Sequence, residues 1–321
     1  MKCLAESRFL CCRTAENGIS TELKVKIHEQ FIQKQDNLTY LRLTISFLLR
    51  SQAKTRLISA ACCCIFISAC SLPEEKFSPF PLDPNFSETS TEISITIKNP
   101  LVCPIRINYA YQSTAIHYEH RLDSAETWVI QLPKEKFDLK DVINNSQFST
   151  TFEARADAII DSTYRYFYPF PKGKTYRVLQ GYNGEESHDN NRYRYAVDLD
   201  LAEGDTICAA REGIVVGVIE GYELGGNWER YNDYANQIVI DHLDGTFGEY
   251  LHLKKGGSLV EVGDEVMGGQ AIGLAGNTGY AAVPHLHFNV LVPSEKGYKS
   301  LPIKFIHIDG KAIKKGFTLS H

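Results

Sequence analysis

The sequence predicts an all-β protein, in which a small β-sandwich-like domain precedes a glycine-rich antiparallel β-sheet domain. Residues 91–97 read TEISITI, and this alternation of polar and apolar side chains is the pattern of a strand with one buried face. From residue 206 onwards, short apolar runs are separated by glycines, which tight turns between strands require. The second part of the chain shows no helical periodicity of useful length. These observations favour two β-domains in succession.

We expect the smaller domain over residues 91–168. The alternation recurs in further stretches, at residues 105–109, 127–132 and 152–158. Turn residues separate these runs at intervals typical of small all-β domains. His117 and His120 lie three positions apart without a third partner, so we predict that they are surface residues. We therefore expect this domain to have a binding or positioning role and not a catalytic one.

Residues 1–70 are predicted to be a disordered leader that ends in a lipoprotein-type signal segment. A basic stretch at residues 50–56 precedes an apolar run of about a dozen residues, which suits a secretory signal and is too short to span a bilayer comfortably. Residues 67–70, Ile-Ser-Ala-Cys, resemble the bacterial lipoprotein box, in which signal cleavage leaves a lipidated N-terminal cysteine. Cys70 is therefore the predicted lipidation site, and we expect an exported protein anchored to a membrane of the cell envelope.

The signal segment begins about fifty residues into the chain, whereas such segments normally stand at its start. We therefore expect the true translation start to lie downstream of Met1, at a non-Met codon. The competing interpretation is a short buried apolar helix in a cytoplasmic protein.

Composition narrows the function classes. The net charge is -5 and no basic block occurs, so we expect no nucleic-acid partner. Beyond position 70 the cysteines are only Cys103 and Cys208, which predicts no disulfide framework. Residues 71–90 are rich in proline and polar residues and are predicted to be a linker behind the anchor.

Two histidines near the C-terminus, His285 and His287, are the strongest candidates for metal binding or catalysis. They lie at the start of an alternating stretch, residues 284–292, and side chains at positions i and i+2 of a strand share one face. Imidazole is the commonest protein ligand of transition metals and a good base near neutral pH. The alternative is a pair of surface histidines on a strand.

An upstream carboxylate and histidine are candidates to complete a metal site. A catalytic zinc usually has three protein ligands and one open position. Asp198 is flanked by apolar residues, and a carboxylate near apolar surface is costly unless it is paired or metal-bound. The alternatives are a turn aspartate bonded to backbone, or Asp200 as the carboxylate in its place. His188 precedes Asp198 by ten positions.

Several short motifs occur in one order along the chain: Ser187-His188, Ala196-Val197-Asp198, Gly204-Asp205-Thr206-Ile207, Ala209-Ala210-Arg211-Glu212-Gly213, Tyr250-Leu251-His252-Leu253, Gly263-Asp264 and Pro284-His285-Leu286-His287-Phe288. Together they resemble the M23 family of zinc endopeptidases, of the lysostaphin or LytM type. The resemblance covers about residues 168–305, and we expect an M23-like domain over residues 169–310. It implies Zn²⁺ as cofactor and the peptide cross-links of bacterial peptidoglycan as substrate.

The same resemblance implies a role for each site residue. His188, Asp198 and His287 would be the zinc ligands, and His252 and His285 would be the two catalytic histidines. In many members of the family the first histidine and the aspartate are only four positions apart, whereas His188 and Asp198 are ten apart, which makes His188 the weakest of these assignments. A further histidine, at position 242, is a fallback ligand for which we favour a structural role or a role in supporting the metal ligands.

Two other functions are compatible with parts of the pattern. A non-hydrolytic cell-wall-binding module or amidase activator on the same fold would be marked by a lost ligand, whereas all five expected positions are filled here.

The glycine-rich stretches at residues 204–215 and 263–270 also resemble the hairpins of lipoyl or biotinyl carrier domains. No lysine stands in a fitting context at a hairpin tip, which disfavours a carrier.

Overall fold

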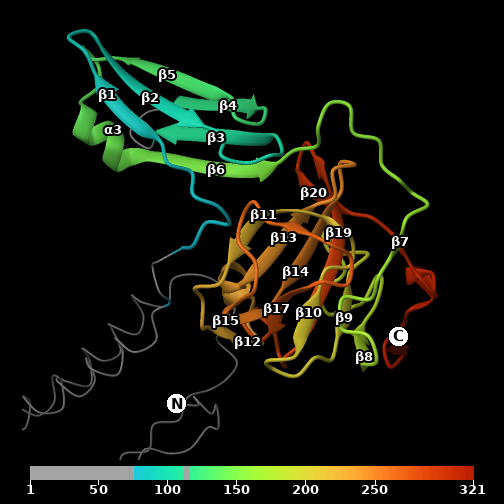
Figure 1. Ribbon diagram of the computed structural model, residues 1–321. Coiled ribbons are helices and arrows are strands. Elements are labelled where there is room, and N and C mark those ends of the chain that lie inside the picture. The colour runs from blue at the N-terminus through green and yellow to red at the C-terminus, as the bar shows by residue number, and fades with distance from the viewer. Residues whose placement is uncertain (1–71, 73–75, 112–115) are drawn as a thin grey trace, which may run out of the picture. The chain divides into compact units, whose positions relative to one another are not determined.

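The computed structural model describes residue 72, residues 76–111 and residues 116–321 (Figure 1). The described residues from 76 onwards belong to one compact unit, Pro73–His321. The predicted leader and its lipidation site at Cys70 lie outside the described residues. Within the described part of the chain, no helix is both long enough and apolar enough to cross a membrane.

Two three-stranded antiparallel sheets form the first part of the described fold. Their orders are β1-β2-β5 and β4-β3-β6, with the bounds β1 Asn85–Glu88, β2 Glu92–Lys98, β3 Ile105–Tyr111, β4 Ile116–Leu122, β5 Thr127–Pro133 and β6 Ser146–Phe152. Every second residue of β2 and of β3 is buried, and both strands contribute to one apolar cluster. A short helix, α3 (Leu139–Asn145), precedes β6 and is capped by Asp138, whose carboxylate accepts from two backbone N–H groups.

Three strand positions differ from the sequence-based expectation. Strand β1 lies inside residues 71–90, the stretch expected to be a linker, and pairs with β2. Most side chains of β1 and β4 are exposed or half-buried, so neither strand carries the alternation that reveals a buried face. The strand expected at residues 152–158 is instead β6, which ends at Phe152.

A nine-stranded sheet dominates the rest of the chain. Its order is β16-β11-β13-β14-β19-β9-β8-β22, and β20 also pairs with β19. The bounds are β8 Thr175–Gln180, β9 Val197–Leu199, β11 Gly213–Ile219, β13 Gln237–Asp241, β14 Phe247–Leu251, β16 Glu265–Val266, β19 Leu286–Ser294, β20 Gly297–Ser300 and β22 Thr318–Ser320. Strand β22 continues the sheet beyond residue 310, the expected end of the second domain.

Smaller elements complete this part. A three-stranded sheet has the order β10-β17-β15, and two strand pairs, β12 with β18 and β21 with β7, are parallel. Their bounds, with those of two 3-10 helices, are β7 Arg165–Tyr166, β10 Thr206–Cys208, β12 Gly225–Gly226, η3 Glu229–Tyr234, β15 Leu253–Ser258, β17 Ala271–Ala275, β18 Gly279–Tyr280, β21 Lys304–Phe305 and η4 Gly310–Ala312. The expectation of an all-β, mainly antiparallel fold is confirmed.

The middle of the large sheet is buried on both faces. All of β14 and the first six residues of β19 are buried. On one face, an apolar cluster joins Tyr250 and Phe288 to side chains of the β10-β17-β15 sheet. The register sets His287 on β19 opposite Leu251 on β14 and opposite Asp198 on β9. Three neighbouring strands therefore meet where the candidate site residues lie.

Candidate functional site

Asp198 and His287 are brought together by the pairing of β9 with β19. The two residues are direct cross-strand partners, and partners in this position hold their Cβ atoms about 5 Å apart. The imidazole Nδ1 of His287 lies 2.9 Å from Asp198 Oδ1. Both side chains are buried, so the pair is held in an environment in which an unpaired carboxylate would be costly.

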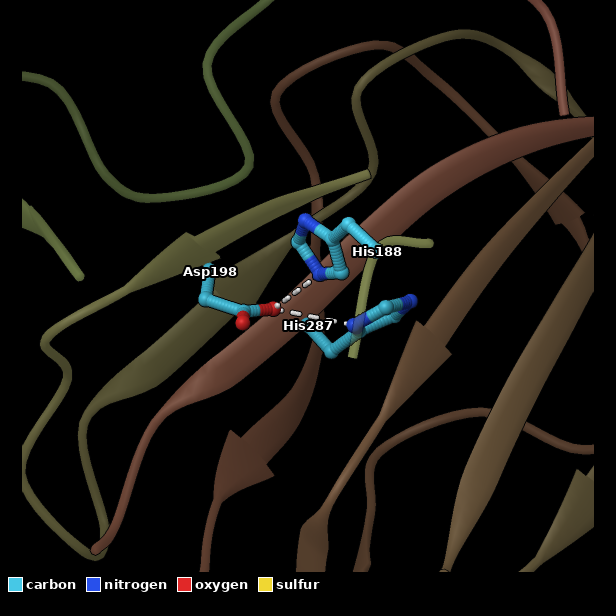
Figure 2. A group of neighbouring side chains, drawn as sticks. All are labelled: His188, Asp198 and His287. Carbon is cyan, nitrogen blue, oxygen red and sulfur yellow. Dashed lines mark hydrogen bonds and ion pairs between the residues drawn. The ribbon is translucent and has the colours of Figure 1, made fainter. Parts of the chain in front are cut away.

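His188 reaches the same carboxylate from the loop between β8 and β9. Its Nδ1 lies 2.9 Å from the carbonyl oxygen of Gly181, to which it donates. Its Nε2 lies 3.3 Å from Asp198 Oδ1. Figure 2 shows this one carboxylate oxygen facing both imidazole rings. The loop thus returns His188 to Asp198 although ten positions separate them in the sequence.

These three residues fit a metal ion. One ligand atom from each lies within 4.8 Å of the other two. Because Nδ1 of His188 carries the proton given to Gly181, Nε2 of the neutral ring presents a lone pair to a carboxylate oxygen and has no hydrogen-bond partner among the described residues. Two facing lone pairs need a cation or a proton between them. Two histidines and one carboxylate are also the donor set of many catalytic zinc sites.

The pKa values respond to the same contacts. Burial disfavours the charged form of Asp198, but hydrogen bonds from the protonated form of His188 and from His287 outweigh it and hold its pKa well below the usual range. Burial also disfavours the imidazolium of His188, yet the hydrogen bond to Asp198 and its charge raise that pKa. Burial lowers the pKa of His287, and the charges of Asp198 and Glu249 only partly oppose this.

His252 and His285 lie next to this group. Their ring centroids are 4.5 Å apart, and the His252 centroid is 6.0 Å from that of His287. Nδ1 of His252 lies 2.7 Å from the Thr278 carbonyl oxygen, and Nδ1 of His285 lies 2.8 Å from that of Val283. Both rings donate through Nδ1, so in the neutral form of each ring Nε2 is the unprotonated nitrogen.

His252 has two further features of a functional residue. It directly follows β14 with φ +68°, a left-handed conformation that is uncommon outside glycine and is often found at functional sites. Burial lowers its pKa well below the usual value, and the nearby His285 and His287 lower it further. This ring is therefore neutral at physiological pH.

The four residues Asp198, His252, His285 and His287 line one pocket with a volume of about 90 Å³. Its other lining residues are Leu179, Gln180, Glu186, Ser187, Asn227, Tyr280, Ala282 and Val283. His188 is not in contact with the pocket and is fully buried beside Asp198.

Gln180 is a site residue whose role the sequence did not reveal. It is the partner of Asp198 in the β8–β9 pairing. Its Nε2 donates to Asp198 Oδ2 over 3.1 Å and to Ser187 Oγ over 2.9 Å, while its Oε1 accepts from the Glu186 N–H over 2.9 Å. The amide therefore ties the carboxylate to the loop that carries His188. Only a reliable register for β8 would have indicated this.

The two fallback residues lie outside the site. His242 directly follows β13, at the end where Asp241 pairs with Phe247, whereas Leu251 pairs with Gln237 at the other end. Its Nδ1 lies 2.9 Å from Thr246 Oγ1, and burial lowers its pKa to about 3. Asp200 is exposed. A structural role for His242 agrees with this placement.

Residues 192–300 match the family model described as Peptidase family M23. The chain carries an M23 peptidase domain. The matched range includes Asp198, His252, His285 and His287, while His188 lies just before it. The likeness to individual relatives is moderate: the chain is 31% identical over 136 residues to peptidoglycan DD-endopeptidase ShyA of Vibrio cholerae, with 41% of this chain and 29% of that protein covered.

Lysostaphin of Staphylococcus staphylolyticus is 37% identical over 120 residues, with 37% of this chain and 23% of that protein covered. The solved catalytic domain of lysostaphin from Staphylococcus simulans is 31% identical and has a TM-score of 0.27, with 43% of this chain and 85% of that chain covered. The chain thus spans less than a third of the length of these two curated relatives.

Proposed function

We propose that the M23 domain is a zinc-dependent endopeptidase that hydrolyses peptide cross-links of bacterial peptidoglycan. The observation that carries the proposal is the convergence of His188 Nε2 and His287 Nδ1 on Asp198 Oδ1, with His252 and His285 beside them. The names of the relatives, a peptidoglycan DD-endopeptidase and lysostaphin, support the substrate class.

In this proposal His188, Asp198 and His287 hold the zinc ion. Bound zinc supplies Lewis acidity, which polarises the scissile carbonyl and makes water a nucleophile at neutral pH. His252 and His285 both line the pocket, and in the neutral form of each ring Nε2 is the unprotonated nitrogen. A ring in this state accepts a proton from the attacking water and returns it to the leaving amine. The carbonyls of Thr278 and Val283 hold the two rings in the required tautomer.

The surroundings of the pocket suit an extended peptide with charges of both signs. Two polar depressions adjoin the site residues. One is lined by Glu203, Glu223, Gly225, Lys254, Lys255, Asn277 and Thr278, and the other by Gln180, Gly181, Tyr182, Asn183, Gly184, Glu185, Glu186, Lys314 and Lys315. The first includes Thr278, which holds His252, and the second includes Gln180, which holds Asp198. Lysine and glutamate side chains in both depressions complement the carboxylates and amines of cross-linked peptides.

We also propose that the protein works in the cell envelope, held at a membrane by a lipid on Cys70. The support is the sequence of residues 50–70 and the location of peptidoglycan outside the cytoplasm. Labelled palmitate should enter the wild-type protein and not the Cys70→Ser variant. Equal labelling of both proteins, or of neither, would reject the anchor.

Hydrolysis is tested by incubating the zinc-loaded protein with purified peptidoglycan and identifying the released fragments by mass spectrometry. We expect fragments that arise by cleavage of a peptide cross-link, and their masses identify the bond. The matched control is His285→Ala, which retains the three proposed ligands. If the wild-type protein binds peptidoglycan and releases nothing, the non-hydrolytic alternative replaces this proposal.

A further inference from the structure

Behind His287 lies a group of buried polar atoms that have no hydrogen-bond partner among the described residues. They are the Nε2 of His287, the Nε of Arg192, the Oε2 of Glu249 and the Oδ1 of Asn289. Buried polar groups are almost always satisfied by protein or by ordered water. Four unsatisfied atoms close together therefore indicate that one common partner satisfies them.

The sheet register brings these side chains together. Glu249 on β14 is the direct partner of Asn289 on β19. His287 precedes Asn289 by two positions, so the two side chains lie on the same face. Nδ1 of His287 lies against Asp198, on the side of the proposed metal position. Nε2 is therefore the nitrogen that faces away from that position.

Arg192 joins the group from the loop that follows His188. Its guanidinium Nη2 donates to Glu249 Oε1, and its carbonyl oxygen accepts from Asn289 Nδ2 over 2.9 Å. The ring of the next residue, Tyr193, lies edge-on to His287, with 5.0 Å between centroids. None of Arg192, Tyr193, Glu249 and Asn289 lines the pocket that His287 faces.

The four unsatisfied atoms comprise two hydrogen-bond donors and two acceptors. His287 Nε2–H and Arg192 Nε–H are donors when Nδ1 of His287 faces a cation, and Glu249 Oε2 and Asn289 Oδ1 are acceptors. One water molecule accepts two hydrogen bonds and donates two. Buried waters commonly satisfy groups of two to four such atoms.

We propose that Glu249 is a positioning residue of the metal site, which accepts the Nε2–H of His287 through one buried water shared with Asn289 and Arg192. Metal-ligating histidines usually donate their second nitrogen to a carboxylate or carbonyl, directly or through water, and this fixes their tautomer and raises their basicity. Arg192 holds the carboxylate and links it to the loop of His188. The inference rests on the proposed metal-binding role of His287.

The test compares two buried carboxylates that each pair with an arginine. Glu249→Gln removes the charge beside His287. Asp241→Asn makes the same change at the end of β13 that lies away from the site. There Asp241 Oδ2 pairs with Arg155 Nη1 over 2.8 Å. Zinc affinity is measured by chelator competition, and unfolding by heat. We expect Glu249→Gln to bind zinc about 10- to 100-fold more weakly, with kcat lowered and KM unchanged, and Asp241→Asn to lose stability only.

Glu249→Asp provides a rescue, since it keeps the carboxylate and should recover part of the zinc affinity. A second measurement needs no variant: in the zinc-loaded wild-type protein, the Nε2 proton of His287 should exchange slowly with solvent in a nitrogen-15 NMR spectrum. Slow exchange would support the inference even if Glu249→Gln failed to fold.

The inference is overturned if Glu249→Gln binds zinc as tightly as the wild-type protein, or if the Nε2 proton exchanges rapidly. Failure of the proposed function gives a different result. A wild-type protein that binds zinc and cuts no peptidoglycan would reject hydrolysis, whereas the difference in zinc affinity between Glu249→Gln and Asp241→Asn would still support positioning by Glu249.

Discussion

His287 and Asp198 face each other across β19 and β9, with 2.9 Å between the imidazole Nδ1 and the carboxylate Oδ1. Both strands lie inside the large sheet, so the backbone ladder sets the separation of these two side chains. A site built on paired strands is held more precisely than one built on loops. His188 differs, because it depends on its bond to Gly181 and on the contacts of its loop.

Replacing His287 by alanine should abolish zinc binding. The loss should exceed the roughly 10- to 100-fold that removal of an outer hydrogen-bond partner costs, because a ligand itself is lost. Metal analysis of the purified wild-type protein should find about one zinc per chain, as a single catalytic site requires. The control is His242→Ala, which removes an equally buried histidine at a distance from the site and should keep the zinc. A folded His287→Ala protein with full zinc content would refute the ligand assignment.

Replacing His285 by alanine should separate metal binding from catalysis. His285 lies 4.5 Å from His252, centroid to centroid, and among the described residues no hydrogen bond or ion pair joins it to Asp198. Loss of a general acid or base typically lowers the rate about 10²- to 10⁴-fold. Release of fragments from cell-wall sacculi measures the rate, and metal analysis should show unchanged zinc. A variant that retains wild-type hydrolysis would exclude His285 from the chemistry.

The sequence predicted residues on regular strands better than residues on loops. Asp198 could be found because apolar residues flank it in the sequence, and His287 because it follows another histidine, His285, by two positions. Gln180 could not, since its role depends on the register between β8 and β9, which includes a shift between Val178 and Gln180.

Glu249 was missed for a similar reason. It lies within β14, in which every residue is buried, so no alternation distinguishes its side chain from its apolar neighbours. Its partner Arg192 lies in a loop without periodicity. The exposed strand β4 escaped prediction because neither of its faces is predominantly apolar.

Replacing Gln180 by alanine should weaken zinc binding by about tenfold or more. The amide orients Asp198 through Oδ2 and holds the loop of His188 through Ser187 and Glu186. Chelator competition measures the change. Gln270→Ala is the control, because this exposed glutamine also accepts from a backbone N–H, that of Met267 at 3.0 Å, in a turn that contributes nothing to the pocket. Equal zinc affinity of the two variants would contradict a role for Gln180.

The stabilisation that zinc gives should increase as the pH rises from 5 to 8. In the metal-free protein Asp198 has a lowered pKa, so its contribution to stability is present above its unfolded pKa of about 3.9 and is lost as the pH falls through the folded value. His188 has a raised pKa, so its contribution is complete below about 6.5 and is lost as the pH rises through the folded value.

The metal-free pair is therefore most stabilising between about pH 4 and 6.5. Zinc must displace the proton of His188, so its apparent affinity should rise up to about tenfold per pH unit until that ring is neutral. The measurement is the difference in Tm between zinc-loaded and metal-free protein at several pH values. His287→Ala, which should not bind zinc, is the control and should show no difference at any pH. A Tm difference that is constant or decreases from pH 5 to 8 would mean that no proton is displaced from His188, and His188 would then not be a ligand.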